Sequence, residues 1–168
     1  MVTGSSLKRG LLKVLGIAMA PIAALVLVGA QPASAATVAA QACTGQVQQN
    51  VCVTITSLGF GFYEVRLGID FRIGLAGAQQ IINAPGEPFS GALFGADSSP
   101  EFLLGVPVTS VGASEESGLS ADFVTTVPRL WLDEDLNDRD EVFGKIRLLD
   151  SRFNVMRTFD TPQIQQFF

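Results

Sequence analysis

Apolar and polar residues alternate along much of the chain after residue 50, and this pattern predicts strands. The clearest case runs from Tyr63 to Ile73, where every odd position is apolar and every even position is polar, charged or glycine. A period of two places one face of a strand against a core and the other against solvent, as in an antiparallel sheet. We expect the even positions to be only a solvated face; they are Glu64, Arg66, Gly68, Asp70 and Arg72.

Shorter runs of alternating or β-branched residues, bounded by turn residues, predict the other strands. They cover residues 51–56, 89–93, 102–111 with an interruption at Pro107, 122–132 with Pro128 near its end, 142–149 and 153–159. One stretch has a helical period instead, because Leu75, Ala78, Ile81 and Ile82 share a face before Pro85 stops the helix. The chain is therefore predicted to be mainly β, an antiparallel β-sandwich or open barrel of about seven strands with one short helix.

The N-terminal region has the order of parts of a secretory signal peptide. A basic head with Lys8, Arg9 and Lys13 precedes Val14–Ala30, which contains no charge, and Ala33-Ser34-Ala35 supplies a small-x-small cleavage site. We expect residues 1–35 to be removed by a cut after Ala35. A retained membrane anchor is the alternative, because an uncharged run of 17 residues reaches the lower limit for a spanning helix.

The remaining chain is predicted to be a single domain of a secreted protein, extracellular or cell-wall associated and of bacterial type. Residues 36–50 are rich in Ala, Gln and Thr without an apolar period, so we expect a mobile N-terminal segment. Residues 51–168 then form the β domain. An exported chain with two cysteines is expected to join them, here Cys43 to Cys52, and this bond would pin the N-terminal segment to the first strand.

Charge limits the choice of partners. Three of the 11 basic side chains and none of the 16 acidic ones precede Ala35, which leaves a formal charge of −8 on the exported chain. Nucleic acid and anionic membranes attract proteins through excess positive charge. We therefore expect neither nucleic acid nor, after the signal peptide is cut, a membrane as a partner, and consider an extracellular protein partner.

Catalytic signatures are scarce. The chain has no histidine, which removes the commonest general base and metal ligand, and it contains no nucleophile elbow, phosphate loop or dinucleotide motif. Paired carboxylates could still serve a glycosidase, but a sequence does not show their separation, and there is only one Trp and one Tyr to stack on sugars. We expect a protein that is not an enzyme.

The densest chemistry is an acidic segment, residues 133–141, in which six of nine residues are Asp or Glu. Ca²⁺ relieves such crowding because it takes six to eight oxygen ligands, often carboxylates on a loop. The candidate ligands are Asp133, Asp135, Asp140 and Glu141. An EF-hand is excluded, because Asp138 stands where its turn glycine belongs. A plain acidic hairpin turn and a patch that grips a basic partner remain alternatives.

These observations predict a small exported domain that acts by binding, with calcium supporting the acidic segment. The alternative is a secreted interaction module without metal, such as an enzyme inhibitor or surface-recognition domain. Its candidate loops are Gly86–Pro100 and Gly112–Ser120, since binding residues often lie on long loops. Trp131 is expected in the core, and Phe167 and Phe168 are expected to pack on the domain.

Overall fold

The computed structural model describes residues 35–96, 99–133 and 139–168. They belong to one compact unit, Ala33–Phe168, so the predicted signal peptide lies outside the described residues except for Ala35. The described part contains ten strands, one α-helix and one short 3₁₀ helix. In chain order these are β1 (Thr37–Cys43), β2 (Gln49–Gly59), β3 (Phe62–Phe71), α1 (Leu75–Ile82), β4 (Phe89–Gly95), β5 (Glu101–Val106), β6 (Val108–Ser114), β7 (Gly118–Pro128), η1 (Arg129–Trp131), β8 (Asp140–Leu149), β9 (Val155–Asp160) and β10 (Ile164–Gln166).

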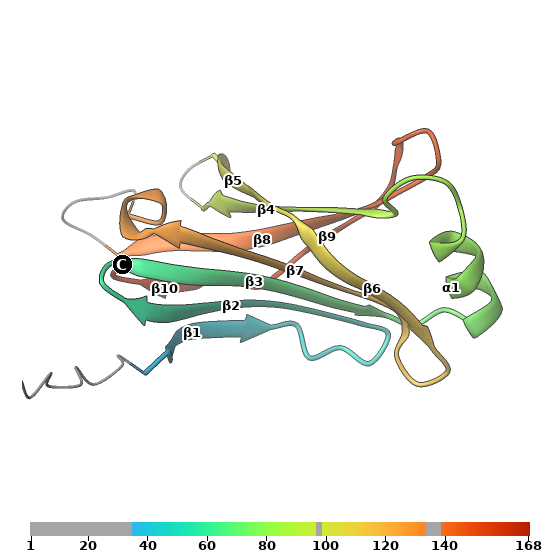
Figure 1. The fold of residues 1–168 in the computed structure, drawn as a ribbon, viewed down its shortest axis with the longest axis horizontal. Coiled ribbons are helices and arrows are strands. Elements are labelled where there is room, and N and C mark those ends of the chain that lie inside the picture. Colours follow the sequence, from blue (N-terminus) through green and yellow to red (C-terminus); the bar gives the residue numbers. More distant parts are fainter. Residues whose placement is uncertain (1–34, 97–98, 134–138) are drawn as a thin grey trace, which may run out of the picture. The chain divides into compact units, whose positions relative to one another are not determined.

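The strands form two antiparallel sheets, which lie as two layers in Figure 1. Sheet A has the order β1-β2-β3-β7-β6. Sheet B has the order β10-β8-β4-β5, and β9 pairs with β8 beyond the end of β10. At Pro107 the chain passes from β5 at the edge of sheet B to β6 at the edge of sheet A.

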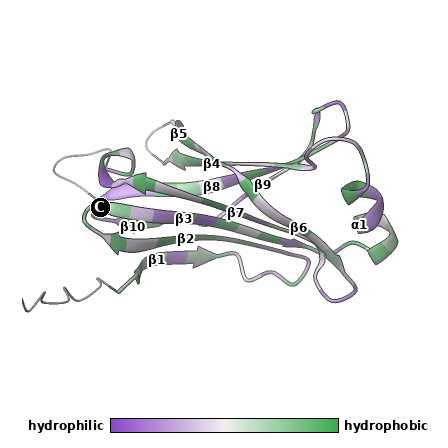
Figure 2. Ribbon diagram, in the orientation of Figure 1, coloured by the Kyte–Doolittle hydropathy of each residue, from purple (hydrophilic) through white to green (hydrophobic). Residues whose placement is uncertain are grey.

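A single apolar core fills the space between the two sheets. The inward side chains of β3, Val65, Leu67 and Ile69, are buried in it. Phe89 of sheet B meets Phe123 of sheet A edge to face, with ring centroids 6.3 Å apart. The sheets approach so closely that a Cβ atom on Gly91 would lie 2.6 Å from Cδ1 of Phe123, so this position of β4 requires glycine. Hydrophobic and hydrophilic residues follow one another along β3 and β8 in Figure 2, as the predicted alternation requires.

The prediction of a mainly β chain with one short helix is confirmed, and α1 covers the predicted residues 75–82. The predicted number of strands is too low. Residues 102–111 form two strands instead of one, because Pro107 separates β5 from β6 and these belong to different sheets. Strand β10 was not predicted, since a strand of three residues is too short to show a period.

The expectation of an irregular, mobile segment over residues 36–50 is corrected for Thr37–Cys43, which form β1 and pair with β2. Backbone pairing holds an edge strand without a strong apolar pattern, and only Ala40 and Ala42 of β1 pack against the core. The predicted disulfide is confirmed. Cys43 and Cys52 face each other across β1 and β2 with their Cα atoms 4.1 Å apart, so the bond fastens the edge strand to its neighbour.

The two loops considered for binding are shorter than expected. Gly86–Pro100 contains β4, and Gly112–Ser120 is the hairpin of β6 and β7, with a turn of residues 115–117. Among the described residues, no helix has the length and apolar character needed to cross a bilayer.

Candidate functional site

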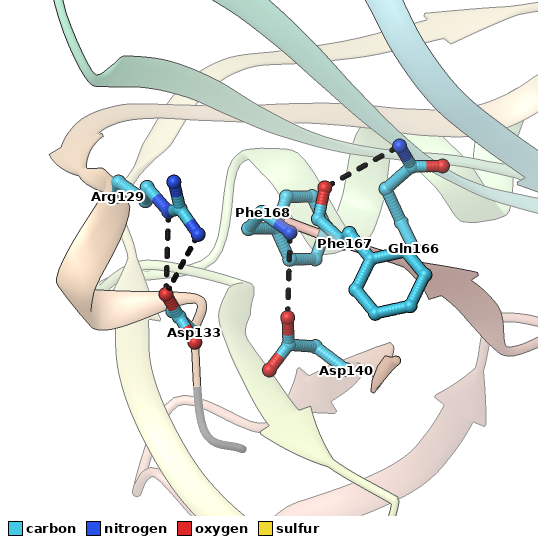
Figure 3. A network of polar contacts seen from close by, with 6 residues as sticks. All are labelled: Arg129, Asp133, Asp140, Gln166, Phe167 and Phe168. Carbon is cyan, nitrogen blue, oxygen red and sulfur yellow. Dashed lines mark hydrogen bonds and ion pairs between the residues drawn. The ribbon is translucent and has the colours of Figure 1, made fainter. Parts of the chain in front are cut away.

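The described acidic residues of the predicted calcium segment each have a partner within the domain. Asp133 follows η1, and its Oδ2 accepts a hydrogen bond from Nε of Arg129 at 3.2 Å and forms an ion pair with Nη2 of the same residue at 3.1 Å. Asp140, at the start of β8, is only 2% exposed and accepts a hydrogen bond from the backbone N–H of Phe168 at 3.4 Å. Figure 3 shows both contacts, and Asp140 thereby holds the C-terminal residue against the core.

Glu141 is engaged on the other side of β8. Its Oε1 accepts a hydrogen bond from Nε2 of Gln165 at 2.7 Å, and its Oε2 accepts one from Nε2 of Gln163 at 3.0 Å. Successive residues of a strand point to opposite faces, so β8 directs the carboxylates of Asp140 and Glu141 apart.

The structure therefore does not bring all four predicted ligands together at one point. Asp135 lies outside the described residues. Among the residues that the structure does describe, there is no group of three or more His, Cys, Asp or Glu side chains arranged to hold a metal ion. Calcium binding by Asp133, Asp135, Asp140 and Glu141 stays a prediction.

A polar groove crosses the outer face of sheet A, the face that was predicted to be only solvated. Its central hollow has a volume of about 320 Å³ and lies over β2, β3 and β7, with Gln41 of β1 at its margin. A second hollow of about 300 Å³ shares Asn50 and Asp70 with the first and continues to the β6–β7 turn. The polar side chains lining the two hollows are Gln41, Asn50, Thr54, Arg66, Asp70, Arg72, Ser114, Glu116, Ser117, Ser120 and Asp122.

Gly68 forms the floor of the central hollow. In the register of sheet A it pairs with Cys52 on one side and Asp122 on the other. A Cβ atom on Gly68 would have a single neighbour within 4 Å, Oδ1 of Asp122 at 3.9 Å. No close contact with another strand therefore requires glycine at this position. Its lack of a side chain leaves the hollow open.

Two carboxylates face this groove from neighbouring strands. Asp122 of β7 pairs with Gly68, and Asp70 of β3 lies two positions further along the same face. Diagonal positions of this kind are about 7–8 Å apart between Cα atoms. Loss of solvent contact, and then the negative charge of Asp122, raise the pKa of Asp70. The negative charges of Asp70 and Asp122 thus lie close to each other in the groove.

The hydrogen-bond partners of these acids differ from those of other aspartates. Asp122 Oδ2 accepts a hydrogen bond from the hydroxyl of Ser110 at 2.9 Å, whereas no described residue donates one to the carboxylate of Asp70. Asp150, in the β8–β9 turn, accepts hydrogen bonds from Asn154 and Arg152, and the bonds from Asn154 are the main reason that its pKa is lowered. Asp70 therefore resembles a ligand-binding carboxylate more closely than Asp150 does.

Sequence reasoning missed Asp70 and Asp122 as candidate binding residues. One signal was available, since Gly68 interrupts the charged series on the even positions of β3. The proximity of Asp122 was not available, because it depends on the pairing of β3 with β7, about 50 residues further along the chain.

Comparison with known proteins adds no family to this geometry. No family model matches the chain, and neither a curated protein nor a solved structure matches it.

Proposed function

We propose that the chain is an exported β-sandwich module that acts by binding, and that its groove on sheet A receives an extended peptide segment of an extracellular protein partner. The observation that carries the proposal is the continuous polar groove with Asp70 and Asp122 on one face. Export is supported by the signal-peptide pattern and by the Cys43–Cys52 disulfide, which suits an oxidising compartment.

The charge of the groove selects a segment that presents a lysine or arginine. Three acidic and two basic side chains line the two hollows, so one added positive charge balances the groove. A cationic side chain between Asp70 and Asp122 would relieve their mutual repulsion and donate hydrogen bonds to the carboxylate of Asp70. The amide of Asn50 and the hydroxyl of Ser120 lie beside this position and suit the polar backbone of an extended chain.

The test is a calorimetric titration of the protein with acetylated tetralysine at low and high salt. We expect binding at low salt that weakens as salt is added, because the contact is between charged groups near the surface. In the double variant Asp70→Asn plus Asp122→Asn, the affinity should fall at least tenfold, a loss of at least about 1.4 kcal/mol in binding free energy.

The matched control is Glu64→Gln, which removes one acidic charge from the same face of β3 outside the groove lining. This variant should bind tetralysine almost as the unaltered protein does. Equal weakening by the control and by the double variant would show a general charge effect and would contradict a site in the groove.

Glycoside hydrolysis is a second candidate function, favoured by the raised pKa of Asp70 beside a second carboxylate. A hydrolase of this kind needs one carboxyl group that stays protonated and one that is ionised. The lining of both hollows contains no aromatic side chain on which a sugar ring could stack, and this favours the peptide. Turnover of a panel of chromogenic glycosides that is lost in Asp70→Asn would instead support the hydrolase.

A further inference from the structure

Four large apolar side chains are exposed at one end of the domain, and we call this set the aromatic end. Phe60 is 93% exposed, Leu130 80%, Trp131 57% and Phe62 48%. The prediction that Trp131 packs in the core is wrong, because β7 ends at Pro128 and η1 then turns the chain away from the sheet. Exposed apolar side chains that gather at one place, unlike ones scattered singly over a surface, mark a contact surface.

The aromatic end is built from two segments that are fixed to each other. The backbone N–H of Arg129, at the start of η1, donates a hydrogen bond to the carbonyl of Gly61 in the β2–β3 turn at 2.7 Å. Phe62 also pairs with Pro128 in the register of β3 and β7. The turn and η1 therefore lie next to each other, at the end of sheet A where β2 passes into β3 (Figure 1). Both segments carry exposed apolar side chains at this end.

The conformation of Phe60 is unfavourable for a phenylalanine. Phe60 and Gly61 are the two central residues of the hairpin turn, with φ angles of 54° and 76°. A two-residue turn with positive φ at both positions favours Asn followed by Gly, since a bulky side chain is strained there. Neither burial nor turn geometry accounts for the ring at Phe60. Strained, exposed residues of this kind occur where a side chain serves a contact.

The position at which the chain enters the domain indicates what the aromatic end contacts. Thr37, the first residue of β1, pairs with Ser57, three positions before Phe60. The uncharged run Val14–Ala30 lies only a short way upstream. The residues between Ala30 and Thr37 span at most about 25 Å when fully extended, at roughly 3.5 Å per residue. A bilayer that holds the apolar run is therefore within reach of the aromatic end.

We propose that, in a chain that keeps residues 1–35 as a membrane anchor, the aromatic end rests on the surface of that bilayer. Trp and Phe side chains are favoured at the boundary between lipid and water, and this boundary accepts convex apolar side chains without a matching pocket. The acidic charge of the domain disfavours contact with anionic lipid, so the domain suits a zwitterionic surface. The centre of the groove, near Asp70, lies eight residues along β3 from Phe62, about 26 Å at 3.3 Å per residue, and so stays clear of the lipid.

The test uses the full chain in phosphatidylcholine vesicles whose acyl chains are brominated. Trp131 is the only tryptophan of the chain, so its fluorescence reports on the aromatic end alone. We expect its emission to be blue-shifted and strongly quenched by brominated lipid relative to unbrominated lipid. Equal emission in the two kinds of vesicle would overturn the proposal. Emission that ignores bromine but depends on protein concentration would also overturn it and would indicate contact between two copies of the chain.

Two matched variants separate docking from tethering. Phe60→Asn keeps the turn, because Asn suits its position, and should reduce the quenching of Trp131 with an unchanged or higher Tm. Phe153→Asn replaces the other phenylalanine with a positive φ, 62°, which is 66% exposed in the β8–β9 turn, and should leave the quenching unchanged. Quenching that persists in Phe60→Asn would show that the N-terminal tether alone brings Trp131 to the lipid.

Discussion

The acidic segment at residues 133–141 and the groove on sheet A both carry carboxylates, but the domain uses them differently. The described carboxylates of the acidic segment each accept hydrogen bonds from within the domain: Asp133 from Arg129, Asp140 from the C-terminal backbone, and Glu141 from two glutamines. In the groove, Asp70 receives no hydrogen bond from a described residue and lies near a second carboxylate, Asp122. A high density of acidic residues in the sequence is therefore a poor guide to the binding surface. The hydrogen-bond partners of each carboxylate in the folded domain are a better guide.

The largest expected change is in the free energy of unfolding on replacing Asp140, and it tests whether this residue has a structural role or a binding role. In Asp140→Ala the buried N–H of Phe168 loses its acceptor, and we expect the free energy of unfolding to fall by about 1.5–3 kcal/mol. Chemical denaturation of the full chain measures this loss. Glu141→Ala, whose two bonds are at the surface, should cost less than about 1 kcal/mol. A negligible effect of Asp140→Ala would contradict its structural role.

Calcium tests the acidic segment directly. If that segment bound calcium with a Kd of about 0.1 mM, then 1 mM Ca²⁺ would add about 1.4 kcal/mol to the stability. If the described carboxylates are satisfied by their partners within the domain alone, the thermal unfolding curve will be unchanged between EDTA and 1 mM Ca²⁺. A stabilisation of about 1.4 kcal/mol that disappears in Asp133→Asn would instead return the binding role to the acidic segment.

A side chain placed in the groove should remove binding without lowering the stability of the domain. In Gly68→Val the side chain occupies the floor of the hollow, where the nearest atom to a new Cβ is 3.9 Å away. Glycine in the interior of a strand costs about 0.5–1 kcal/mol, so we expect equal or greater stability together with loss of tetralysine binding. A folded Gly68→Val protein that binds tetralysine with unchanged affinity would exclude the groove.

The smallest effect is a pH dependence from Asp70. A raised pKa in the folded state means that this group favours folding most below the unfolded value of 3.8, and that this contribution is lost as the pH rises through the folded value. Asp70→Asn should therefore raise Tm slightly at pH 7 and have no effect below about pH 3.5. Thermal unfolding across this range measures the difference, which is small because Asp70 loses only part of its contact with solvent. An equal Tm change at both pH values would show that burial and Asp122 do not act on the carboxylate.

Local patterns predicted the fold better than they predicted the site. The period of two gave the inward face of β3, and the helical period gave α1, because both depend on neighbours in the sequence. Strand β1 escaped prediction because backbone pairing and the Cys43–Cys52 bond hold it, and neither requires apolar side chains. The groove was not predicted either, because Asp70 and Asp122 are brought close together only by the pairing of β3 with β7.

The exposed Trp131 shows a second limit of local patterns. Residues 122–132 read as one apolar strand, and the register of β7 holds as far as Pro128. The hydrogen bond from Arg129 to Gly61 then turns the chain into η1, which a period of two does not predict. Leu130 and Trp131 within η1 are therefore exposed, whereas Leu132 directly after it is buried in the core again.

Amide chemical-shift mapping of the ¹⁵N-labelled protein during a tetralysine titration tests most directly whether the groove, and not the acidic segment, is the binding surface. We expect the largest shifts at Asn50, Asp70, Ser120 and Asp122, and little change at residues 139–141. Largest shifts at residues 133–141, with the groove amides unmoved, would contradict the assignment of binding to sheet A.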